Sequence, residues 1–125
     1  MDRTDPRQAT GTRGESLART DLETRGYEIL DTGFRTRYGE IDIIARDGET
    51  LVFVEVRTRR GIECGTAAES VSRQKQWKVS RAAAAYLAAN GGDNRPCRFD
   101  VVAIDYDPDG RPTIVVYPNA FESCY

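Results

Sequence analysis

The stretch YGEIDIIARDGETLVFVEVRTRR, residues 38–60, contains two runs rich in Ile and Val that are joined by Asp47-Gly48. An Asp-Gly pair between such runs predicts a β-hairpin with a two-residue turn. If Asp47 and Gly48 form the centre of that turn, residue 46 faces 49, 44 faces 51 and 42 faces 53. Alternation then places Asp42 and Glu55 on one face of the hairpin, as diagonal neighbours roughly 7–8 Å apart at Cα.

Two carboxylates on one face of an apolar hairpin predict a divalent cation, because like charges close together destabilise a sheet. The alternative is a solvated polar face on which Glu55 pairs with Arg57 along the strand. The chain has no histidine. Any metal must then be bound by oxygen atoms, which favours Mg²⁺ or Mn²⁺ over zinc, and the commonest general base is missing.

Length and composition indicate one domain in a chain of 125 residues. Residues 1–11 are polar and aperiodic and are expected to form a disordered tail, followed by a single domain over residues 12–125. No apolar run approaches the roughly 20 residues that span a bilayer, and the N-terminus does not resemble a signal peptide. Three cysteines without a CxxC pair favour reduced thiols in the cytoplasm.

The rest of the chain predicts helices and strands around the hairpin. Ser70 or Ser72 is expected to cap the second helix. The pattern is helix, three strands, helix and two strands, so the fold class is α/β with a mixed sheet, in which a right-handed crossover joins two parallel strands. The expected elements outside the hairpin are a helix from Thr12 to Gly26, a strand over 27–32, a helix to about Ala89, and strands over 98–106 and 113–117.

Two charged residues lie on helix faces that should be buried. Thr12 and Glu15 match a capping box, yet Glu15 also lies on the buried stripe and could point toward Asp42. Lys75 lies one turn before the apolar stripe of the second helix, which begins at Val79, and is expected to approach the strand that carries Glu55.

Basic residues are concentrated between Arg57 and Arg81. This segment contains seven basic and only two acidic residues, in a chain of net charge −2. A basic segment beside a carboxylate face suits a ligand with a phosphate backbone. The alternative is a solvated helix face that serves solubility.

Several motifs, taken in order, resemble the YraN family of bacterial proteins, and the likeness covers about residues 13–122. The family is similar to restriction-endonuclease-like PD-(D/E)xK nucleases and to archaeal Holliday junction resolvases. The motifs are Gly14-Glu15, GEIDIIA at 39–45, LVFVEVRTR at 51–59, Lys75, RFDVV at 98–102 and Asn119-Ala120-Phe121.

The resemblance implies a restriction-endonuclease-like fold and a metal-dependent endonuclease that hydrolyses phosphodiesters in branched DNA. Asp42, Glu55 and Glu15 would bind Mg²⁺ or Mn²⁺. Arg57 stands where the nuclease pattern has lysine, and because arginine stays protonated it cannot accept a proton from water. The implied catalytic residues are Asp42, Glu55, Arg57 and Lys75, and the expected nucleic-acid contacts are Arg35, Arg37, Arg59, Arg60, Arg73 and Lys78.

Two other functions stay open. The arginine at position 57 favours a non-catalytic nucleic-acid-binding adaptor that keeps the nuclease fold. An interaction protein without a nucleic-acid role is disfavoured by the basic segment. The symmetric cutting of resolvases makes a homodimer plausible, and no membrane partner is expected.

Overall fold

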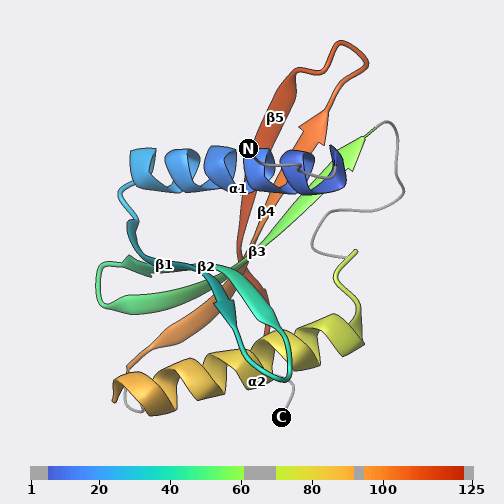
Figure 1. The fold of residues 1–125 in the computed structure, drawn as a ribbon. Coiled ribbons are helices and arrows are strands. Elements are labelled where there is room, and N and C mark those ends of the chain that lie inside the picture. Colours follow the sequence, from blue (N-terminus) through green and yellow to red (C-terminus); the bar gives the residue numbers. More distant parts are fainter. Residues whose placement is uncertain (1–5, 61–69, 92–94, 123–125) are drawn as a thin grey trace, which may run out of the picture.

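The computed structural model describes residues 6–60, 70–91 and 95–122 of the chain (Figure 1). The predicted order of helices and strands is confirmed. The elements are α1 (Pro6–Thr24), β1 (Glu28–Arg35), β2 (Glu40–Asp47), β3 (Thr50–Arg60), α2 (Arg73–Asn90), β4 (Cys97–Tyr106) and β5 (Pro112–Phe121).

The five strands form one mixed sheet in the order β1-β2-β3-β4-β5. β3 and β4 pair in parallel, as predicted, while the other neighbours pair antiparallel. The connection between β3 and β4 contains α2, because parallel neighbours require a crossover.

The two helices cover opposite faces of the sheet, α1 on one side and α2 on the other (Figure 1). Each face has its own apolar core. Ile43 and Val54 pack with Ala18 and Leu22 of α1, whereas Phe53 packs with residues of α2. The predicted buried stripes of both helices are confirmed, since the buried residues include Ala18, Leu22, Val79, Ala82 and Ala83.

The two-residue turn of the hairpin lies one residue later in the chain than predicted. Asp47 pairs with Thr50, so Gly48 and Glu49 form the centre of the turn and the register shifts by two. Gly48 has φ 61°, which suits a turn with glycine at its first central position. Asp47 instead stays in the strand and accepts a hydrogen bond from Arg98 at 3.0 Å. A shift of two preserves which residues share a face.

The first helix begins at Pro6 rather than near Thr12. Proline suits the first helical position, because its missing N–H has no intrahelical partner there. Thr12 is therefore inside the helix and the capping-box hypothesis for Glu15 is wrong. Residues 6–11 of the expected disordered tail are helical, and residues 1–5 lie outside the described part of the chain.

The second helix begins and ends as predicted. Ser72 is the N-cap, and its hydroxyl accepts a hydrogen bond from the N–H of Lys75 at 3.1 Å. Gly91 ends the helix in the left-handed conformation, with φ 64°. The predicted loop at 61–69 lies outside the described residues.

A buried carboxylate fastens the two edges of the sheet to its centre. Asp100 of β4 is 0% exposed and accepts hydrogen bonds from Arg98 (3.0 Å), the Tyr27 hydroxyl (3.2 Å) and the Asn119 N–H (2.9 Å). Asn119 has φ 53°, and the β4–β5 register shifts between Phe99 and Val101. β5 therefore extends to Phe121, beyond the predicted Tyr117.

Neither helix among the described residues is long and apolar enough to cross a membrane. Cys97 is an exposed free thiol, and the other two cysteines, Cys64 and Cys124, lie outside the described residues.

Candidate functional site

β2 changes its course at Asp42. Side chains two residues apart on a strand share a face, yet Ile41 packs in the core under α2 and Ile43 in the core under α1. The paired register of β2 and β3 runs from Asp47 to Ile43. Before Ile43, a side chain replaces the backbone as the acceptor for β3: the Asp42 Oδ2 accepts a hydrogen bond from the Val56 N–H at 2.8 Å.

This break lets three carboxylates converge. Glu15, Glu40 and Asp42 are half-buried, and one carboxylate oxygen of each lies within 4.8 Å of the others. The pKa of Glu15 is raised, first by burial and then by the negative charges of Asp42 and Glu40. Glu15 thus points toward Asp42, which is the second of the two roles that its sequence position allowed.

Gly14 makes the approach of α1 possible. A Cβ atom at this position would lie 2.7 Å from Oγ1 of Thr58 on β3, which is too close for ordinary packing. The absence of a side chain lets the helix backbone lie directly on the sheet and so places the next residue, Glu15, over Asp42.

Glu55 lies beside the cluster and is buried, with 4% of its surface exposed. Its Oε1 has no hydrogen-bond partner within the described residues, and Lys75 Nζ lies 3.7 Å from its Oε2. Burial raises the pKa of Glu55 to about 8, assisted by the charge of Asp42 and a hydrogen bond with it; these effects outweigh Lys75 and Arg57, which lower the pKa.

Lys75 reaches Glu55 from the first turn of α2, as predicted. The backbone N–H of this same residue donates the N-cap hydrogen bond to Ser72, so the cap orients the turn that carries the ammonium group. Lys75 is partly exposed, with 36% of its side chain accessible, and can therefore face both the carboxyl and a ligand in solution.

Arg57 lies two residues after Glu55. Its Nε donates a hydrogen bond to Ser70 Oγ at 3.3 Å, which links β3 to the segment that precedes α2. The structure therefore brings together Glu15, Asp42, Glu55, Arg57 and Lys75, which are all of the predicted metal-binding and catalytic residues.

The predicted nucleic-acid contacts are more dispersed. Arg59 forms a two-point ion pair with Asp105 at 2.8 and 3.2 Å, and this pair joins β3 to β4. Arg60 lies over the Tyr106 ring, and Arg35 pairs with Glu40 at 3.3 Å. The remaining three, Arg37, Arg73 and Lys78, are exposed.

Glu40 is the acidic residue that the sequence interpretation did not assign to the site. Strand alternation does place it on the face of Asp42, two residues away, and that spacing is the signal that could have identified it. Its ion pair with Arg35 also brings a basic residue of β1 to the edge of the site.

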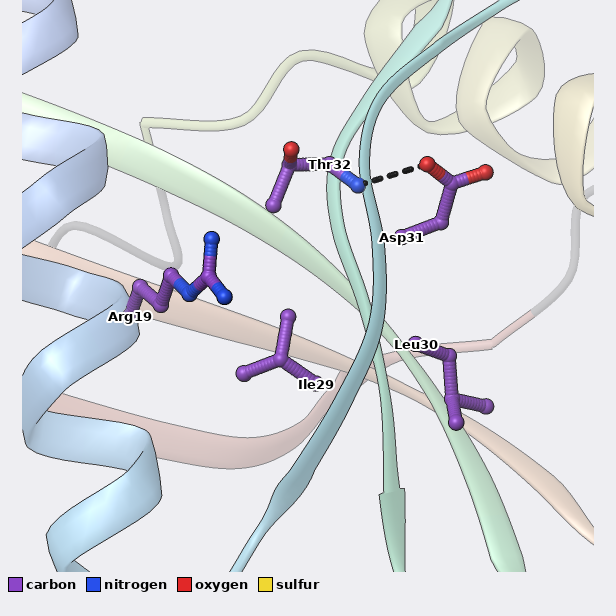
Figure 2. A pocket seen from close by; sticks show the side chains of 5 residues that line it. All are labelled: Arg19, Ile29, Leu30, Asp31 and Thr32. Carbon is purple, nitrogen blue, oxygen red and sulfur yellow. Dashed lines mark hydrogen bonds between the residues drawn. The ribbon is translucent and has the colours of Figure 1, made fainter.

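Two open hollows lie between α1 and β1, and Glu15 lines one of them. Figure 2 shows the Arg19 side chain extending from α1 toward Ile29 and Thr32 of β1, while Leu30 and Asp31 lie on the other side of the strand. A neighbouring hollow is lined by Glu15, Ser16, Arg19 and Thr32. The two hollows share Arg19 and Thr32, so Glu15 is accessible from this side.

Together, the fold and this site define a small α/β protein with a cluster of acids and a lysine at a break in its mixed sheet. We call it the carboxylate–lysine cluster (Glu15, Glu40, Asp42, Glu55 and Lys75). The chain belongs to the uncharacterised protein family UPF0102, whose model matches residues 14–104. This confirms the resemblance to YraN. The matched range contains Glu15, Asp42, Glu55 and Lys75.

Relatives in the family align over nearly their whole length. The chain is 48% identical to a UPF0102 protein of Symbiobacterium thermophilum over 113 residues, covering 90% of this chain and 96% of the relative. A UPF0102 protein of Geobacter sulfurreducens is 48% identical over 115 residues, or 92% and 90% of the two chains. One from Syntrophus aciditrophicus is 45% identical over 116 residues, or 93% and 91%.

Proposed function

We propose that the protein is a Mg²⁺- or Mn²⁺-dependent endonuclease that hydrolyses phosphodiesters in DNA, with branched DNA as the preferred substrate. One observation carries the proposal. The buried carboxyl of Glu55 has an oxygen without a hydrogen-bond partner among the described residues, and it lies between Asp42 and Lys75. An unsatisfied buried carboxyl is costly for stability, which supports a functional role.

The residues present fit a hard divalent cation. All the converging donors are carboxylate oxygens, the ligands that Mg²⁺ and Mn²⁺ prefer, and their mutual repulsion would be relieved by a cation. Asp42 and Glu15 would hold the ion together with Glu40, whose carboxylate converges on theirs, and Glu55 would add a ligand from beside Asp42. When bound, such an ion lowers the pKa of a coordinated water and polarises the phosphate.

The chain's own cations would act on the phosphate. The Lys75 ammonium lies 3.7 Å from the Glu55 carboxyl and is also accessible from solvent. It can therefore stabilise negative charge that develops on the phosphate oxygens. Arg57 is fixed by Ser70 and can orient the phosphate through its planar guanidinium. Neither role requires Arg57 to accept a proton.

A non-catalytic nucleic-acid-binding adaptor is the second candidate, and the arginine at position 57 favours it. If Lys75 does not replace the missing lysine, the fold would bind DNA without cutting it. The cytoplasmic location and the homodimer also stay predictions.

Cleavage of branched, single-stranded and duplex DNA, with EDTA, Mg²⁺ or Mn²⁺, tests the proposal. We expect metal-dependent cleavage that falls at least about 100-fold in Asp42→Asn, Glu55→Gln and Lys75→Met. Glu49→Gln is the matched control, because Glu49 is an exposed acid at the hairpin turn. DNA binding without metal should survive in all four variants.

Calorimetry with Mn²⁺ separates the enzyme from the adaptor. An active site should bind the ion in the unmutated protein and lose that binding in Asp42→Asn. If protein free of contaminating nucleases cuts none of these substrates and binds no Mn²⁺ through Asp42, the adaptor is the better account.

A further inference from the structure

Two aromatic rings and two arginines form a partly exposed platform where the β1–β2 connection meets α2, which we call the Tyr38–Trp77 platform (Arg37, Tyr38, Trp77 and Arg81). The two rings meet edge to face, with centroids 6.2 Å apart. The Arg81 guanidinium lies over both of them, 4.4 Å from the Tyr38 centroid and 5.4 Å from that of Trp77. Arg37 lies over Tyr38 at 4.9 Å.

The platform is held by the connection between β1 and β2. The Thr36 hydroxyl accepts hydrogen bonds from the N–H groups of Tyr38 (3.0 Å) and Gly39 (3.2 Å). A Cβ at Gly39 would lie 3.0 Å from Cβ of Lys78, so glycine lets this connection pack directly on α2. Figure 1 shows the connection reaching α2. Tyr38 is thus presented in a fixed position.

Trp77 does not belong to the core of α2. It is 40% exposed, while the residues that α2 buries against the sheet are Val79, Ala82 and Ala83. Arg73 and Arg81 lie one turn before and one turn after Trp77, so the three side chains form one stripe along the helix. A partly exposed indole between cations, outside the apolar core, favours a ligand that has both flat rings and negative charge.

The platform and the carboxylate–lysine cluster take residues from the same two parts of the chain, the start of β2 and the first turns of α2. Tyr38 precedes Glu40 by two residues, and Trp77 follows Lys75 by two residues. Residues two apart on a helix point in different directions, so a strand with a phosphate at Lys75 would reach Trp77 by passing around α2. Bases in a duplex are stacked on one another, so only an unpaired nucleotide offers a free face.

We propose that the Tyr38–Trp77 platform binds unpaired nucleotides, with a base stacked on Trp77 and the adjoining phosphates at Arg37 and Arg73. The inference rests on the proposed function and narrows its substrate class to DNA with a single-stranded segment beside the scissile phosphate.

Trp77 is the only tryptophan of the chain, so its fluorescence reports on this position alone. We expect single-stranded oligo(dT), titrated into the full chain in EDTA at low salt, to quench the fluorescence. The same strand with abasic residues keeps the phosphates but has no bases, so it should bind without quenching. Equal quenching by both strands would overturn stacking and leave only attraction of charge.

Affinities measured by anisotropy of a labelled strand give a second test. Trp77→Ala should weaken single-strand binding about 5- to 30-fold and duplex binding less than about 2-fold, whereas Trp77→Phe should restore most of the affinity. Leu30→Ala is the matched control, since Leu30 is a similarly exposed apolar residue on β1. Circular dichroism verifies that each variant is folded.

The two proposals fail in different ways. Metal-dependent cleavage with equal single-strand affinity in the unmutated protein and Trp77→Ala would overturn the platform and leave the endonuclease intact. Quenching in EDTA without cleavage under any metal would support the platform on an adaptor. Tight binding to duplex alone would overturn the platform.

Discussion

Two buried carboxylates of the same protein have opposite surroundings. Asp100 is satisfied by the guanidinium of Arg98, a hydroxyl and a backbone N–H, which marks it as structural. Glu55 keeps an oxygen without a hydrogen-bond partner in the described part of the chain, beside another acid. Burial alone does not distinguish the structural carboxylate from the functional candidate. The number of hydrogen-bond donors around each carboxylate does.

The raised pKa of Glu55 predicts how stability depends on pH without metal. Because its pKa is about 8 in the folded protein and 4.5 as the ordinary value, the folded state binds more protons between these values. Stability should therefore fall as pH rises through this window, by up to about 5 kcal/mol from this residue. Urea unfolding in EDTA at a series of pH values measures it.

Glu55→Gln should flatten this dependence and raise stability near pH 8, because glutamine has no charge to bury. Glu49→Gln, at an exposed acid, should leave the dependence unchanged. A pH profile that is the same in Glu55→Gln and in the unmutated protein would contradict the assigned role of burial.

At the scale of the elements, the sequence predicts the hairpin faces better than its register. Asp47-Gly48 located the turn but not its centre, because Asp47 is retained in the strand by Arg98, a residue distant in sequence. The face of Asp42 and Glu55 follows from alternation, which a shift of two residues does not alter. Ser72 and Gly91 were identifiable because capping depends on local chemistry.

Strand alternation puts Glu40 on the face of Asp42, but the close convergence of Glu15 with both acids could not be read from periodicity. It depends on the break in β2, where Ile41 and Ile43 enter different cores. It also depends on the close approach of α1 at Gly14. Both features arise from packing between elements that are distant in the chain, and local sequence patterns do not contain that information.

Gly14 provides a prediction about this helix–sheet contact. In an ordinary helix interior Gly→Ala stabilises by about 1 kcal/mol. Here the new methyl would meet Thr58, so Gly14→Ala should destabilise the protein by about 1–3 kcal/mol. Thermal and urea unfolding measure the change, and any cleavage activity should fall with it because Glu15 is displaced.

The double variant Gly14→Ala/Thr58→Ala is the control for that contact. In the Thr58→Ala background the clashing hydroxyl is absent. Gly14→Ala should therefore lower the free energy of unfolding much less there than in the unmutated protein. A stabilising effect of Gly14→Ala in the unmutated background would show that the helix does not approach the sheet this closely.

At the scale of the whole molecule, the basic residues of the segment from Arg57 to Arg81 differ in the partners they already have. Arg73 lies at the start of α2 and Arg60 at the end of β3, whereas Arg59 is occupied by Asp105. The predicted nucleic-acid contacts therefore differ in how readily they can bind a phosphate. Arg60 and Arg73 can do so without breaking an ion pair with a described residue, whereas Arg59 cannot.

Salt dependence distinguishes a phosphate-binding surface from a solvated one. Arg60→Gln and Arg73→Gln should each reduce the slope of log affinity against log salt by about 0.7 on single strands, through lost counterion release. Arg111→Gln, at the exposed turn between β4 and β5, should not change the slope. Fluorescence anisotropy at several salt concentrations gives these slopes, and identical slopes in all three variants would indicate that the basic segment only serves solubility.

The hydrogen bonds to Asp100 have a consequence for how the sheet opens. Edge strands usually fray first, and their amide hydrogens exchange with solvent before those of the centre. Here the residue before β1 and the bulge of β5 both bond to the same buried carboxylate of β4. Opening either edge removes a hydrogen bond from this buried carboxylate, which keeps only its pairing with Arg98 and the bond from the other edge, so both edges should resist separate opening. The amide of Asn119, although it lies near the end of the chain, should exchange as slowly as the amides of β3.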